Sequence, residues 1–191
     1  MVVFVILIKK IFILWKDEKI MAQDYINANH IICESTNILS TNFGGGHIYS
    51  IAVSEDMDNG LLVARAEYVD AEYEDEVWNM KEYAAGDEAL LLLNPPLLPM
   101  TELRGYATED RFYNAKGDRV RAYTLRMGDR ITLSEVAFDA KPEAKQYVTF
   151  DAGEKKYIVG DTKTEGQFCA QVLTKIARTH QMMYKIQVVS L

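Results

Sequence analysis

The second half of the chain is a succession of short β-type segments, and this pattern constrains the fold more than any other feature of the sequence. From residue 103 onward the segments recur at spacings near ten residues, and each is bounded by Gly or Asp. Short strands separated by such turns are typical of a small β-barrel or sandwich. We therefore expect a mainly β protein. The predicted strands are residues 120–125, 131–133, 147–150, 157–159, 168–177 and 182–189.

Two shorter features accompany these strands. Residues 134–138 have the pattern of one short helical turn, with Ser134 placed to accept a backbone hydrogen bond at its start. Residues 89–93 form an apolar run that stops at Asn94-Pro95-Pro96. A run this short, bounded by proline, favours a buried strand over a helix. We expect residues 90–100 to lie in the core.

The clearest local pattern lies in residues 47–68. Residues 47–53 alternate apolar with small or polar side chains, and residues 61–68 resume a β-type composition. Between them Asp58-Asn59-Gly60 supplies a turn, because Asn and Gly tolerate the positive φ angles that tight turns require. The pattern predicts a β-hairpin.

Residues 1–20 differ from the rest of the chain. They hold two apolar runs separated by Lys9 and Lys10, and charged residues follow at positions 16–19. This layout fits neither a spanning helix of about 20 apolar residues nor a signal peptide. We expect the product to start at Met21, with residues 1–20 a mis-assigned upstream start or non-native leader. A membrane or secretory segment and an amphipathic arm are the alternatives.

Residues 21–46 are polar and end in three successive glycines. Such a composition is typical of an irregular or extended segment, and a glycine run favours a flexible joint. We expect residues 21–46 to form an N-terminal extended arm, followed by a single β-rich domain over residues 47–191.

Charge is distributed unevenly along the chain. The whole sequence has 28 acidic and 21 basic side chains, for a net charge of −7. Residues 54–88 hold twelve acids against two basic side chains, whereas residues 101–191 hold fifteen basic and twelve acidic ones. The acidic stretch is either a face exposed to solvent or a contact surface. A contact surface is possible because regions of opposite charge on one molecule steer its association with a second copy or a partner. Since phosphate binding needs a basic face, we expect no nucleic acid partner.

The sequence lacks the residue groupings of a known catalytic or metal site. The histidines are His30, His47 and His180, and the cysteines are Cys33 and Cys169. Zinc needs three or four ligands, with a second pair at a definite spacing from the first, and these residues do not supply one. No G-x-S-x-G elbow, phosphate loop or G-x-G-x-x-G fingerprint occurs. We expect no enzyme, no metal and no cofactor, and assign no catalytic or binding residue.

Residues 46–190 resemble a group of small virion proteins of tailed phages, the head decoration or capsid cement proteins encoded beside the major capsid protein. The likeness rests on GHIYSIAVSEDMDNGLLV, on the strand pattern of residues 112–125, on the Gly128-Asp129 turn and on the turn at residues 134–138. The closing FCAQVLTKIARTHQMMYKIQVV is similar to the paired terminal strands of that group. The acidic insert at residues 67–88 departs from the pattern.

The resemblance implies a phage virion structural protein that binds the outer capsid surface and stabilises the head without catalysis. Its partner would be the major capsid protein, and a homo-oligomer such as a trimer is compatible with it. The protein would reside on the capsid surface of the virion, after assembly in the host cytoplasm, with no nucleic acid or membrane partner. Two alternatives stay open: a tail or neck structural protein of a phage, and a cellular β-barrel binding module.

Overall fold

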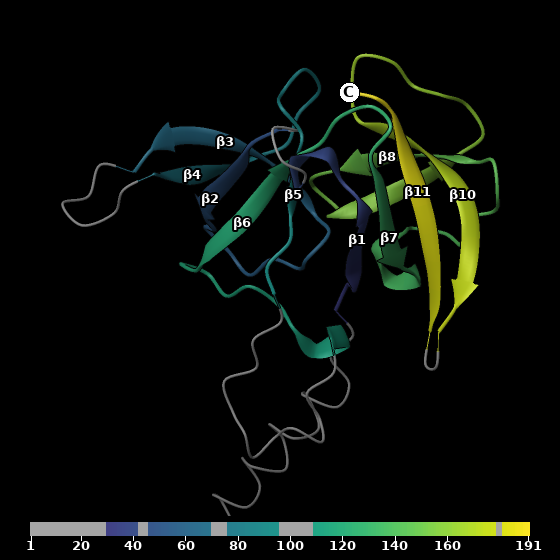
Figure 1. Ribbon diagram of the computed structural model, residues 1–191, viewed down its shortest axis with the longest axis horizontal. Helices are drawn as coiled ribbons and strands as arrows, with labels where there is room; N and C mark the ends of the chain where they lie inside the picture. The colour runs from purple at the N-terminus through teal and green to yellow at the C-terminus, as the bar shows by residue number, and fades with distance from the viewer. Residues whose placement is uncertain (1–29, 42–45, 70–75, 96–108, 179–180) are drawn as a thin grey trace, which may run out of the picture.

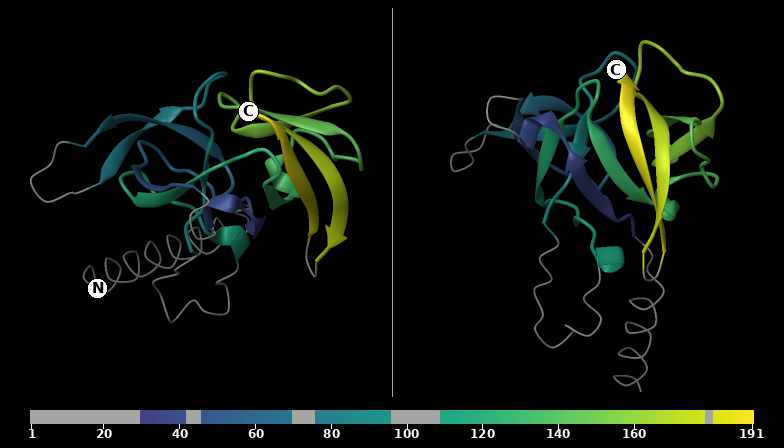
Figure 2. Two further views of the ribbon diagram at one scale, coloured as in Figure 1. Left: turned by 45° about the horizontal axis from the view of Figure 1, so that its top comes forward. Right: turned by 45° about the vertical axis from the view of Figure 1, so that its right-hand side comes forward.

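The computed structural model describes residues 30–41, 46–69, 76–95, 109–178 and 181–191. These residues form a mainly β protein in which a closed five-stranded barrel lies beside a six-stranded sheet (Figures 1 and 2). The expected fold class, mainly β with a barrel and a short helical turn, is confirmed. The helices of the described residues are three isolated 3-10 turns: η1 Leu39–Thr41, η3 Glu109–Arg111 and η4 Glu135–Ala137.

The sheet is antiparallel throughout, in the order β1-β7-β11-β10-β8-β9. Side chains alternate between its two faces, as the pleat of a strand requires. In β11, for example, Ile186 and Val188 are buried, whereas their neighbours Lys185 and Gln187 stay partly exposed. The strands are β1 Cys33–Asn37, β7 Arg130–Ser134, β8 Tyr147–Asp151, β9 Lys156–Gly160, β10 Cys169–Ala177 and β11 Met182–Ser190.

The barrel has the strand order β2-β4-β3-β5-β6 and is closed, so it leaves no free edge. Strands β2 and β4 are parallel, and the other pairs are antiparallel. The three residues of β5 are all fully buried, which confirms the predicted buried strand at that position. Beyond β5 the expected core segment is not buried as predicted, because Leu93 and Asn94 are half-buried and Pro95 is exposed. Residues 96–100 lie outside the described residues. The strands are β2 Ile48–Ala52, β3 Leu62–Tyr68, β4 Val77–Glu82, β5 Leu90–Leu92 and β6 Arg119–Thr124.

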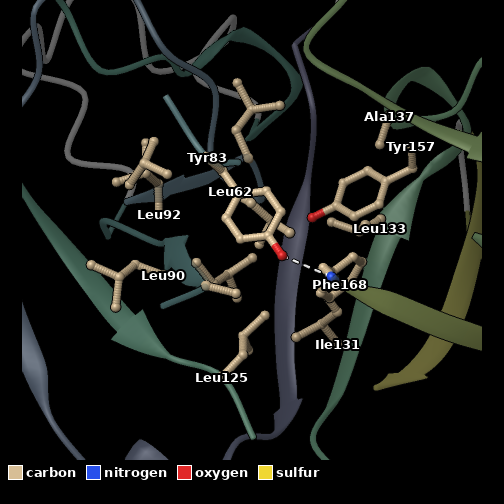
Figure 3. Close-up of a cluster of buried hydrophobic side chains, with 14 of the residues drawn as sticks. Leu62, Tyr83, Leu90, Leu92, Leu125, Ile131, Leu133, Ala137, Tyr157 and Phe168 are labelled. Atoms are coloured by element: carbon tan, nitrogen blue, oxygen red, sulfur yellow. Dashed lines mark hydrogen bonds between the residues drawn. The ribbon is translucent and has the colours of Figure 1, made fainter. Parts of the chain in front are cut away.

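One hydrophobic core joins the barrel to the sheet. The chain enters through β1 of the sheet, builds the barrel, and returns to the sheet at β7 beside β1. Figure 3 shows Leu90 and Leu92 of the barrel facing Ile131 and Phe168 of the sheet half, all of them within a single buried cluster. Burying a large apolar side chain contributes about 1.5–3 kcal/mol, so the shared cluster binds the two halves firmly.

The predicted hairpin at residues 47–68 is wrong in its pairing. Both of its strands exist, as β2 and β3, but they are not neighbours. Strand β2 pairs with β4 and β6, while β3 pairs with β4 and β5. The segment that connects β2 to β3 forms its backbone hydrogen bonds with later parts of the chain. Gly60 N–H donates to Leu92 O at 2.7 Å, and Met57 exchanges backbone hydrogen bonds with Asn114. Long-range partners therefore override the local turn signal.

The expected arm at residues 21–46 also needs correction where it is described. Residues 33–37 are a strand of the sheet, paired with β7, and not an extension outside the domain. Ile31 and Ile38 belong to the buried core. The apolar residues of this segment therefore fold with the domain, which includes residues 30–41 as well as the expected 47–191. The expected leader at residues 1–20 lies outside the described residues.

Ser134 differs from its predicted role. The helical turn η4 follows it as expected, but the Ser134 side chain makes no capping hydrogen bond. Its Oγ instead accepts a hydrogen bond from the Ile32 backbone N–H at 3.0 Å. Ser134 is fully buried, and the residue that immediately precedes β1 supplies a backbone donor that needs a partner there.

The two edge strands of the sheet are modified. Beside β9, Asp139 N–H donates to Tyr157 O, and the Asp139 carboxylate accepts from Val159 N–H at 2.9 Å. The pairing of β1 with β7 is interrupted by a register shift between Ser35 and Asn37. Covered edges and bulges of this kind hinder pairing with a strand of another chain.

Candidate functional site

Buried polar contacts are concentrated around residues 58–60, which we call the 58–60 hub. The Asp58 carboxylate accepts hydrogen bonds from His30 Nδ1 at 2.7 Å and from Ile31 N–H at 3.0 Å. Both partners precede β1, so Asp58 holds the entry to the sheet. Tyr157 of β9 donates its phenolic hydrogen to Gly60 O at 2.5 Å. The hub therefore connects the barrel to both the first and the last strand of the sheet order.

Asn59 uses its amide group to join two further segments to the hub. Its Nδ2 donates to Asn94 O at 2.8 Å, and its Oδ1 accepts from Asn94 N–H at 2.9 Å. Asn114 Nδ2 donates to Met57 O at 3.0 Å and to Asn59 Oδ1 at 3.2 Å. Both asparagines are buried. Hydrogen bonds between buried amides and backbone groups fix the geometry of a core.

Gly60 is placed where no other residue fits. Its φ angle is 87°, which L side chains rarely adopt. A Cβ at this position would lie 2.7 Å from Leu133 Cδ2 and 3.0 Å from Cys33 Cβ. The segment between β2 and β3 therefore lies so close to the sheet that only glycine fits at position 60.

A second polar contact joins the two halves across the core. Tyr83, which follows β4, accepts a hydrogen bond at its phenolic oxygen from Phe168 N–H at 2.7 Å (Figure 3). Burial raises the pKa of Tyr83, and the nearby Asp87 carboxylate raises it further, against the opposing effect of the Phe168 hydrogen bond. Burial also raises the pKa of Tyr157 well above its ordinary value. Both phenols are therefore neutral structural groups near neutral pH.

An arginine with aromatic neighbours occupies the barrel. The Arg65 guanidinium lies 4.5 Å from the centroid of the Tyr49 ring and 4.9 Å from that of Trp78. Its Nε lies 3.1 Å from Glu88 Oε2, and Thr124 Oγ1 donates to Glu88 Oε1 at 3.2 Å. Cation–π contacts and an ion pair with this arrangement link β2, β3, β4 and β6. These contacts stabilise the barrel. Because Arg65 and Glu88 have partners within the barrel, no ligand is needed to explain why they are there.

The cysteines and histidines considered from the sequence do not assemble into a site. His30 is paired with Asp58 and stacks on Tyr113 at 5.0 Å between ring centroids. Cys33 packs against the core, and burial raises the pKa of its thiol to about 12, with a further contribution from Glu34. Cys169 is fully buried. A thiol with so high a pKa stays protonated and unreactive at neutral pH. His180 lies outside the described residues.

Described residues beside the hub line a small cavity. It holds about 50 Å³ and is bordered by Ile31, Cys33, Asn59, Asn94 and Glu109. Small-molecule sites usually measure about 300–1,000 Å³. This cavity has room for a few solvent molecules and no more.

The described residues contain neither a candidate metal site nor a candidate membrane helix. No three His, Cys, Asp or Glu side chains in that part of the chain are grouped as metal ligands. No helix in it has the length and apolar character that crossing a membrane requires.

Comparison with known proteins does not place the chain in a family. No family model matches it, and no curated protein and no solved structure gives a significant match.

Proposed function

We propose that this protein is a structural component of a phage virion, which binds the outer surface of the capsid and stabilises the head without catalysis. The sequence pattern of residues 46–190 suggests the class of protein. The structural observation that supports it best is the single core shared by barrel and sheet. A body built in this way keeps two differently shaped surfaces in fixed relation, as a clip between neighbouring subunits must.

The physical basis of such stabilisation is mass action. A protein that binds the assembled shell and not its free subunits lowers the free energy of the shell by the free energy of binding. A shell offers many equivalent sites, so modest contacts at each site sum to a large effect. The clip itself must not deform, and the contacts of the 58–60 hub and of Tyr83 hold its two halves together.

Cosedimentation tests the proposal. Expanded shells and unexpanded procapsids, assembled from the major capsid protein of the same genome, are mixed with the purified full chain and pelleted. We expect the chain to pellet with expanded shells and to saturate at a fixed ratio to capsid subunits. An unrelated protein of the same net charge serves as the control.

Two results would count against the proposal. A chain that stays in the supernatant with both kinds of shell has no capsid-binding function. Self-assembly into rings or tubes without any shell would instead indicate a tail or neck protein.

A further inference from the structure

Four adjacent strands of the sheet present one continuous outer face. Strands β1, β7, β11 and β10 lie side by side (Figure 1). Ile131 pairs with Ile186 and both are fully buried, so their neighbours along each strand point outward. The registers place these outward residues in two rows across the strands. The first row is Glu34, Lys185 and Thr174, and it includes the register position of Thr132, which is buried with its Oγ1 2.7 Å from Thr36 Oγ1. The second row is Asn37, Arg130, Gln187 and Gln171. We call the seven of these residues other than Thr132 the four-strand face.

The four-strand face carries positive charge in an acidic protein. Strands β7, β10 and β11 contain no Asp or Glu. Arg130 and Lys185 form no ion pair with any residue that the structure describes. The single carboxylate of the face, on Glu34, is already paired with Arg178 at 3.0 Å. The two cations are therefore free to meet a carboxylate from outside.

Apolar side chains adjoin one end of this face. The Asp129 carboxylate accepts hydrogen bonds from Leu39 N–H at 2.9 Å and from Arg126 N–H at 2.8 Å, which brings η1 beside the turn after β6. Leu39 is 43% exposed, and Met127 in that turn is 72% exposed. Gln187 Nε2 reaches Gly128 O at 3.5 Å, so the turn touches the second row. We call Leu39, Arg126 and Met127 the rim cluster.

From this arrangement we infer that the four-strand face and its rim cluster form the surface that docks on the shell, against an acidic protein surface with an apolar spot. The inference rests on the proposed function and names the contact surface for it. Methionine and arginine are enriched at protein interfaces, and acidic residues are depleted. Unpaired cations beside exposed apolar side chains therefore fit a partner whose carboxylates surround a small apolar patch.

Charge favours a protein partner over a nucleic acid. The chain carries a net charge of −7, which opposes approach to a polyanion. The face and rim together offer three cations without ion pairs among the described residues: Arg126, Arg130 and Lys185. Duplex DNA carries about one charge per 1.7 Å and would require a denser basic surface.

The test compares two double variants of equal charge. Arg130→Glu with Lys185→Glu reverses the cations of the face, and Lys116→Glu with Arg121→Glu reverses two exposed cations of the barrel. Affinity for expanded shells of the same genome is measured by cosedimentation at low and moderate salt. We expect the face variant to bind about tenfold more weakly and the barrel variant to stay within about twofold of the unmodified chain.

A second pair tests the apolar contact. Met127→Asp should weaken binding, whereas Ile48→Asp, at an exposed apolar residue of barrel strand β2, should not. Urea unfolding checks that every variant folds. If the charge-reversed face does not fold, Arg130→Gln with Lys185→Gln takes its place, because it removes the charges without adding repulsion.

The outcomes separate the inference from the proposed function. If the unmodified chain binds shells and the face and barrel variants bind equally well, the face assignment is wrong and the proposed function stands. If the unmodified chain binds no shell, both are wrong. If a short DNA duplex binds the unmodified chain and not the face variant, the acidic protein partner is wrong.

Discussion

At the scale of single residues, Gly60 tolerates change least. Its positive φ angle and the closeness of Leu133 and Cys33 both exclude a side chain. Gly60→Ala should lower the free energy of unfolding by about 2–5 kcal/mol, the sum of a left-handed backbone cost and an overpacking cost. Urea denaturation measures the difference.

The control is Gly117→Ala. Gly117 has a similar φ angle of 92°, but a Cβ there meets no atom within 4 Å. Gly117→Ala should lower the free energy of unfolding only by the cost of the left-handed backbone conformation, about 1–2 kcal/mol. If both variants lost the same free energy of unfolding, a Cβ at position 60 would not clash with Leu133 and Cys33.

Cys33 makes stability depend on alkaline pH. The folded thiol has a pKa of about 12 against an ordinary value of 9.0, so between these values the folded state keeps a proton that the unfolded chain releases. The stabilisation is complete below pH 9 and is lost as pH rises toward 12, with a slope of up to about 1.4 kcal/mol per pH unit. Urea unfolding between pH 8 and pH 10 should show a shallower decline for Cys33→Ala than for the unmodified chain. If the free energy of unfolding fell equally with pH in both proteins, the Cys33 thiol would not be shielded from water.

At the scale of elements, the positions of the strands followed from the sequence but their pairing did not. Alternation and turn residues depend on neighbours within about ten positions, and they located β6 to β11 closely. The partners of β2 are β4 and β6, which come later in the chain, so the Asn59-Gly60 turn misled the prediction of a hairpin. The same residues do form a turn, with Gly60 at positive φ.

The polar contacts between elements could not be predicted from the sequence either. Asn59 has the composition of an exposed turn, yet its amide is buried against Asn94 and Asn114. Tyr157 and Gly60 are 97 residues apart in the chain. No local pattern specifies partners at such separations. The sequence does place Asn59 and Asn94 beside apolar runs, where a buried amide needs a partner.

Tyr83 tests the link between the barrel and the sheet. Tyr83→Phe removes the acceptor of the buried Phe168 N–H and should cost about 1–3 kcal/mol. Tyr123→Phe is the matched control, because no described residue forms a hydrogen bond with the Tyr123 hydroxyl. Thermal unfolding compares the two. A Tyr83→Phe variant as stable as the control would show that water satisfies Phe168 N–H.

At the scale of the whole molecule, barrel and sheet should behave as one unit. Their apolar residues form one cluster, and β1 joins the sheet although the barrel separates it from β7 in the chain. We expect a single cooperative unfolding transition. Hydrogen exchange followed by mass spectrometry should show β3 and β11 opening with the same free energy. Exchange in β11 while β3 stays protected would indicate two independent halves.

The melting temperature of expanded shells tests the central claim most directly. Shells built from the major capsid protein of the same genome are heated alone and with saturating amounts of the full chain, and their disassembly is followed by light scattering. A ligand of the assembled state must raise that temperature, with a shift that grows with the concentration of the chain. We predict such a rise. A melting temperature that does not change at saturating concentration would contradict the proposal that this protein stabilises a capsid.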